Sequence, residues 1–162
     1  MRFWLMVLVV FGSTSASAVE ITHFRSGLAC ASGWICQPTQ EILVTDQGTC
    51  VFNGKETPCT WVGFEFDYTG APKGAKLQCV SETSVPTDRG NPSKLIASDS
   101  TSENFEFELP AGDGHFFNPQ YFTYVTRPAD KSIVINTAQC AFEGKVVFEY
   151  RYNLHYATAP RD

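Results

Sequence analysis

Apolar and polar residues alternate along several stretches of this chain, as they do in strands that bury one face. The longest stretch is Lys145 to Tyr156, where almost every second position from Val146 onward is apolar or aromatic. Thr60 to Tyr68 and Asn104 to Leu109 show the same alternation over shorter lengths. A repeat of two does not fit a helix, which turns once in about 3.6 residues, so these stretches are predicted strands.

Four further segments have the composition of strands, because they are rich in β-branched and aromatic residues. They are Glu41 to Thr45, Ala75 to Glu82, Tyr121 to Thr126 and Ser132 to Thr137. Turn residues separate them, and Asn53-Gly54 is typical of a hairpin. One short helix is expected after Asn91, which precedes a proline. The pattern predicts an all-β fold, an antiparallel β-sandwich of Ig-like or jelly-roll-like type with about seven or eight strands.

Residues 1–18 are typical of a cleavable signal peptide. Arg2 is basic, Phe3 to Phe11 is an unbroken apolar run, and Ala16-Ser17-Ala18 fits the small-residue cleavage pattern. A membrane span needs about 20 apolar residues, roughly twice this run. We therefore expect residues 19–162 to form a single exported domain without a membrane span, located in the periplasm or outside the cell.

All six cysteines follow this segment, so an exported domain would carry them into an oxidising compartment. Pairing of nearest neighbours gives three disulfides: Cys30 with Cys36, Cys50 with Cys59, and Cys79 with Cys140. Other connectivities stay open, since six cysteines allow fifteen pairings. A two-residue turn at Asn53-Gly54 would place Cys50 opposite Thr57, so the second bridge needs a longer loop or a bulge. The cysteine spacing matches no zinc motif, and we expect neither a metal nor a cofactor.

The chain is acidic, with 12 basic and 17 acidic residues and a formal charge of −5. Loss of Arg2 with the signal would make this charge −6. Binding to nucleic acid or to anionic lipid needs clustered lysine and arginine, so the composition argues against both. We expect a monomer with no nucleic-acid partner.

Candidate chemistry lies on the predicted outer face of the Thr60 to Tyr68 strand, where Trp61, Glu65 and Asp67 point the same way. A tryptophan beside two carboxylates suits a glycoside hydrolase, because it offers a stacking platform, an acid and a base. The alternative is a solvated sheet face. We favour the second interpretation, since the chain has no nucleophile-elbow, zinc-protease, P-loop or dinucleotide motif. No catalytic residue is predicted.

Aromatic residues form the second candidate. The segment from His115 to Tyr124 carries five of them, including Phe117 and Tyr121, around a proline that is expected outside any central strand. Trp34 lies in the short loop that a bridge between Cys30 and Cys36 would hold. Exposed aromatics mark contacts with proteins or glycans, although the same rings could instead close one end of a sandwich.

The run from Asp99 to Asn104 is rich in side-chain oxygens, which suits calcium. It lacks the glycine and the spacing of an EF-hand. We expect a polar loop whose side chains bond to nearby backbone.

These observations favour a non-catalytic binding module that recognises a protein partner in the envelope or outside the cell, as an inhibitor or an immunity protein does. A module that binds envelope glycans through exposed tryptophans is the alternative, and a small glycoside hydrolase is the third interpretation. The candidate binding residues are Trp34, Trp61, Glu65, Asp67, Phe117 and Tyr121.

Overall fold

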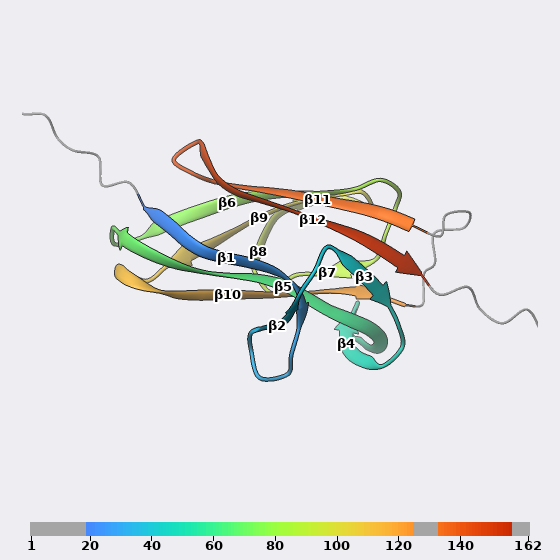
Figure 1. Cartoon of the computed structure of the whole chain (residues 1–162). Coiled ribbons are helices and arrows are strands. Elements are labelled where there is room, and N and C mark those ends of the chain that lie inside the picture. The colour runs from blue at the N-terminus through green and yellow to red at the C-terminus, as the bar shows by residue number, and fades with distance from the viewer. Residues whose placement is uncertain (1–18, 125–132, 157–162) are drawn as a thin grey trace, which may run out of the picture.

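The computed structural model describes residues 19–124 and 133–156, which form two sheets that pack face to face (Figure 1). Sheet A contains β1 (Glu20–Ala29), β2 (Ile35–Pro38), β4 (Gly48–Phe52), β5 (Lys55–Ala71), β7 (Arg89–Gly90) and β10 (Gly112–Thr123). Sheet B contains β3 (Glu41–Val44), β6 (Ala75–Thr83), β8 (Lys94–Ser98), β9 (Ser102–Leu109), β11 (Ile133–Phe142) and β12 (Lys145–Tyr156). The predicted all-β sandwich is confirmed.

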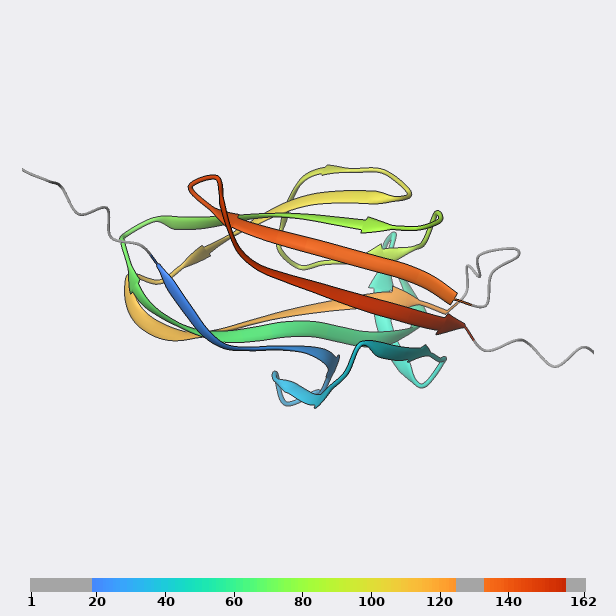
Figure 2. The same cartoon turned by 45° about the horizontal axis from the view of Figure 1, so that its top comes forward.

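Strand order is β2-β1-β5-β10-β7 in sheet A, where β4 also pairs with β5, and β3-β12-β11-β6-β9-β8 in sheet B. Neighbouring strands are antiparallel except β3 and β12, which run parallel. Figure 2 shows β11 and β12, in orange and red, in one layer and β5, in green, in the other. The described residues contain twelve strands rather than seven or eight. The additional strands are short or lack a regular alternation.

Two local predictions need correction. The residues after Asn91 form β8, at the edge of sheet B, and not a helix. Pro119 lies within β10, although proline has no N–H to donate to a sheet. Among the described strands, β7 pairs only with Tyr121 and Phe122, so the second edge of β10 is open at Pro119. An open edge tolerates a residue that cannot donate.

The aromatic cluster of the core follows from the predicted alternation. β5 turns Phe64 and Phe66 inward, and both are fully buried. Rings from both sheets pack around them, with centroids as close as 4.3 Å between Phe107 and Phe116. The aromatic cluster consists of Phe24, Phe64, Phe66, Phe107, Phe116 and Phe148. Burial of large rings is a main source of hydrophobic stabilisation.

Further along the same strands the interior becomes polar. Gln120 of sheet A donates to the Asn118 Oδ1 at 2.8 Å and to the Tyr150 hydroxyl of sheet B at 3.0 Å. Arg89 reaches from sheet A to Glu103 of sheet B, with 3.3 Å between Nε and Oε2. We call these residues and two neighbours the polar cluster: Ser81, Arg89, Glu103, Asn118, Gln120, Asn136 and Tyr150. Its hydrogen bonds link the two sheets.

Two of the three predicted disulfides form, Cys30–Cys36 and Cys79–Cys140. The third does not, and Cys50 and Cys59 are buried free thiols. The Asn53-Gly54 hairpin is a tight turn with φ of 49° and 75°, and it pairs Cys50 with Thr57. The two cysteines are therefore diagonal neighbours, whose backbones are farther apart than those of opposite residues, and their thiols interact by a hydrogen bond instead of a disulfide. Burial raises the pKa of Cys59 and keeps it a thiol.

The two disulfides indicate an oxidising, extracytoplasmic environment. One joins the ends of a short loop, and the other joins the neighbouring strands β6 and β11 in sheet B. The predicted signal peptide lies outside the described residues.

Candidate functional site

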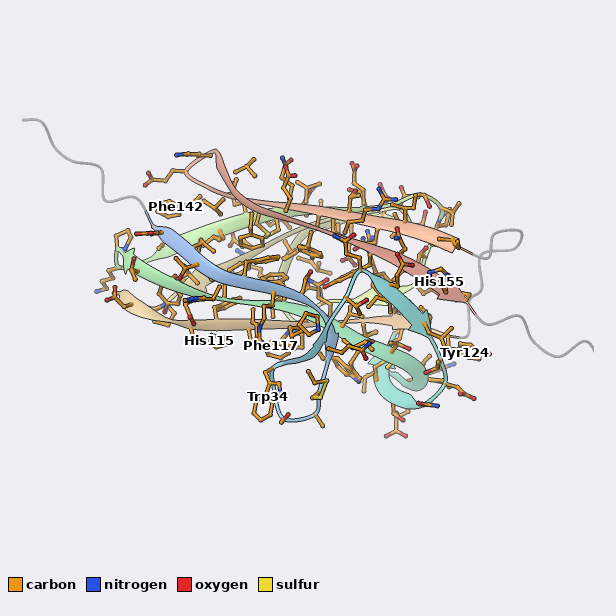
Figure 3. The ribbon with its side chains drawn as sticks, viewed as in Figure 1. Trp34, His115, Phe117, Tyr124, Phe142 and His155 are labelled. Atoms are coloured by element: carbon orange, nitrogen blue, oxygen red, sulfur yellow. A yellow bond between two sulfur atoms is a disulfide. The ribbon has the colours of Figure 1, made fainter. Side chains whose placement is uncertain are left out.

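The outward side chains of β5 and β10 form a continuous surface, because the antiparallel register sets them side by side. Trp61 lies opposite Tyr121, Glu65 opposite Phe117, and Asp67 opposite His115. We call these six residues the β5–β10 face. It brings together five of the six predicted binding residues, and Figure 3 shows Trp34, the sixth, on the same side of the sheet as His115 and Phe117.

An apolar pocket of about 320 Å³ opens on this face. Its walls come from the start of the Cys30–Cys36 loop and from the outward residues of β5 and β10. The lining residues are Ala29, Cys30, Ala31, Gly33, Trp61, Phe117 and Pro119. The pocket is bounded almost entirely by carbon atoms, so it suits an apolar group rather than a charged one.

The Trp61 ring forms one wall and is held from two sides. Its indole Nε1 donates to the Thr49 carbonyl at 3.1 Å, and its ring packs edge-on against Tyr121 at 5.2 Å. The Tyr121 hydroxyl in turn donates to the Val51 carbonyl at 2.6 Å. These bonds fix both rings to β4, and the wall is therefore pre-formed.

The Trp34 loop, residues 30–36, stands next to the pocket. Its disulfide is supported by hydrogen bonds from the Cys30 N–H to the Trp34 carbonyl and from the Gly33 N–H to the Cys30 carbonyl. The Trp34 side chain is 52% exposed, whereas Ile35 beside it is buried. The loop is thus anchored by one apolar residue and presents the other to solvent.

Glu65 anchors this loop from below. Its side chain is 1% exposed, and its carboxylate forms an ion pair with Arg25 and accepts the Ile35 N–H at 3.1 Å. His115 Nε2 lies 3.7 Å from the same carboxylate. A buried charge is stable only when it is paired and hydrogen-bonded, and Glu65 meets both conditions. The arrangement accounts for Glu65 as a support of the Trp34 loop.

Asp67 is shared by two histidines. His23 Nδ1 lies 2.9 Å from its Oδ2, and His115 Nδ1 lies 2.8 Å from its Oδ1. Hydrogen bonds with both histidines lower the pKa of Asp67, and the bond with His115 has the larger effect. His23 reaches the carboxylate from a bulge in β1, where its φ is 50°.

Sequence reasoning missed three members of this surface, His23, Arg25 and His115. His23 and Arg25 lie on β1, whose bulge breaks the alternation that would have revealed the strand. His115 lies two residues after Asp113 in the sequence, but the register pairs it with Asp67 on another strand. No signal in the local sequence gives that register.

No protein-family model matches the chain, and no curated protein matches it. The described ranges contain no helix of the length and hydropathy that a membrane crossing requires. Within residues 19–124 and 133–156, no group of three or more histidine, cysteine or acidic side chains could hold a metal ion.

Proposed function

We propose that this protein is an exported binding module that recognises a protein partner, in the periplasm or outside the cell, through the β5–β10 face and the Trp34 loop. The observation that carries the proposal is a pre-formed apolar pocket beside an exposed tryptophan. Protein interfaces concentrate their affinity in a few apolar side chains that fill such pockets. A loop already held by a disulfide also loses little entropy on binding.

The expected partner inserts one aromatic or branched aliphatic side chain between Trp61 and Phe117. The surface around that side chain is expected to be basic, because the chain has a formal charge of −5 and the face carries the half-exposed carboxylate of Asp67. Opposite charges on the two partners raise the association rate and favour the correct orientation.

The same geometry gives less support to a hydrolase. Glu65 is buried and its carboxylate is engaged by Arg25 and by the Ile35 N–H, so a substrate has little access to it. Asp67 is accessible, but an acid and a base must both reach the scissile bond. A binding role needs neither carboxylate to be reactive.

The first test is site-specific photo-cross-linking. A photoreactive amino acid is placed at Trp34 or, as a control, at Leu43, which is 56% exposed on the outer face of sheet B. Each protein is illuminated in native envelope and secreted fractions, and products are identified by mass spectrometry. We expect one protein cross-linked from Trp34 at near-equal stoichiometry and absent from the Leu43 sample.

The second test measures affinity for the purified partner. Trp34→Ala is expected to weaken binding about 30-fold, the effect of losing a side chain that contributes about 2 kcal/mol. Leu43→Ala removes a similarly exposed apolar side chain and should change the affinity less than about twofold. Equal effects of the two substitutions would contradict the proposal. Retention on insoluble wall polysaccharide that Trp61→Ala abolishes would support glycan binding instead.

A further inference from the structure

A second cavity, separate from the apolar pocket, lies beside the polar cluster. It is open to solvent, has a volume of about 480 Å³ and is bordered by β7, by the segment after β8 and by the end of β4. Its volume lies within the range of small-molecule sites, which is about 300–1,000 Å³. Unlike the pocket on the β5–β10 face, its walls are mostly polar.

Two hydrogen-bond donors on residues that line this cavity have no partner in the described part of the chain. They are Arg89 Nη1 and Asn91 Nδ2, and both are buried. The rest of each side chain is fixed. The Arg89 side chain is 6% exposed, pairs with Glu103 through Nε and donates to the Ser81 carbonyl through Nη2. Asn91 Oδ1 accepts the Ser93 N–H at 2.9 Å.

Buried donors without a partner are rare in proteins, because each has lost its hydrogen bonds to water. Two of them on neighbouring residues of one cavity wall point to an occupant that supplies acceptor oxygens. Neither nitrogen is open to bulk solvent, so the occupant must enter the cavity and displace the atoms that cover them.

The charges of the lining residues limit what that occupant can be. The positive charge of Arg89 is paired with Glu103, and two further acidic residues, Asp88 and Asp99, line the same cavity. Three carboxylates against one guanidinium disfavour a phosphate, a sulfate or a carboxylate. The acceptor is therefore expected to be neutral.

The cavity also has an apolar side, to which Phe52, Leu95 and Tyr121 contribute. Sugars are neutral ligands with this combination. Their hydroxyl groups donate and accept hydrogen bonds, and their apolar C–H face packs on an aromatic ring. We propose that this cavity binds a neutral sugar, whose hydroxyl oxygens accept hydrogen bonds from Arg89 and Asn91. The site does not depend on the function proposed for the β5–β10 face.

The test is a nuclear magnetic resonance titration of the oxidised, isotope-labelled protein. The neutral probes are glucose, galactose, mannose and N-acetylglucosamine, each added at millimolar concentrations. Glucuronate, which has the glucose ring plus a carboxylate, is the charged comparison. We expect at least one neutral sugar to shift the side-chain signals of Arg89 and Asn91 saturably, and glucuronate to bind at least tenfold more weakly than glucose.

Two matched variants locate the binding. Asn91→Asp keeps the shape and the acceptor for Ser93 but removes the free donor, and is expected to weaken sugar binding at least tenfold. Asn53→Asp makes the same chemical change on another residue that lines the cavity, and should have less than a twofold effect. Trp34→Ala, on the other surface, should have none.

The proposal fails if none of the neutral sugars shifts these signals, if the two aspartate variants bind alike, or if glucuronate binds as tightly as glucose. A silent titration would mean that the two donors are satisfied by water alone. If Asn91→Asp does not fold, the comparison of glucose with glucuronate on the unaltered protein decides the question.

Discussion

The two clusters inside this sandwich are held together by different forces. The aromatic cluster depends on ring packing. Each contact between two atoms is weak and depends little on direction, and the total stabilisation is proportional to the buried area. The polar cluster depends on hydrogen bonds and one ion pair, each of which needs a particular partner at a particular distance. The stability of the aromatic cluster should therefore fall when side-chain volume is removed. The stability of the polar cluster should fall when one member of a hydrogen-bonded pair is removed and the other stays buried without a partner.

The largest expected effect is in the aromatic cluster. Phe64 is fully buried and packs against six other rings, so Phe64→Ala should lower the free energy of unfolding by about 4 kcal/mol. Phe64→Leu retains most of the volume and should cost about 1.5 kcal/mol or less. Urea unfolding of both variants measures the difference. Similar losses in the two variants would show that volume is not what this cluster responds to.

The next effect is in the polar cluster. Arg89→Met leaves the Glu103 carboxylate buried without its partner and should lower the free energy of unfolding by about 3 kcal/mol. Replacing both residues, as Arg89→Met with Glu103→Leu, removes the unpaired charge and should recover most of that loss. The same unfolding measurement on the single and double variants gives the coupling energy. Strictly additive losses would contradict the contrast between the clusters.

The same contrast explains how much of the fold was predictable. Lys145 to Tyr156 was predicted with the bounds that β12 has, because one face is apolar throughout. The alternation predicts only part of β10. Asn118 and Gln120 are buried and point inward, but a polar residue in a sequence is typical of the surface. Polar interiors cannot be read from alternation, because the partner that makes burial tolerable is remote in the chain.

The candidate site divides in a similar way. Alternation along β5 was sufficient to set Trp61, Glu65 and Asp67 on one face, apart from the core. Alternation along β5 does not predict the pocket, because Phe117 and Pro119 of β10 form part of its wall. It does not predict the partners that the two carboxylates have on β1 either. Both depend on strand register, and register depends on contacts between segments about 40 to 60 residues apart that no local pattern encodes.

The smallest expected effect is a difference in how stability changes with pH at two acidic residues, Asp99 and Glu103, of which Glu103 belongs to the polar cluster. Asp99 lies in the predicted polar loop, and its Oδ1 accepts the N–H groups of Thr101 and Ser102 and the Thr101 hydroxyl. These hydrogen bonds lower the pKa of Asp99, and the bond from the Thr101 N–H has the largest effect. Burial instead raises the pKa of Glu103, against the opposing effect of Arg89.

The two shifts predict opposite responses to acid. The contribution of Asp99 is complete above its unfolded pKa of about 3.9 and is lost as pH falls through its lower folded value. Glu103 takes up its proton more readily in the folded state, so its contribution grows as pH falls through the folded value toward the unfolded value of about 4.3.

Urea unfolding between about pH 7 and pH 3, across the unfolded pKa values of these groups, distinguishes the two residues. The stability advantage of the unaltered protein over Asp99→Asn should shrink toward the acidic end, because protonated Asp99 resembles asparagine. Its advantage over Glu103→Gln should grow over the same range, because only the unaltered protein gains stability as Glu103 is protonated. If both differences changed in the same direction, Glu103 would have to be solvated like Asp99, and the polar cluster would not be a buried network.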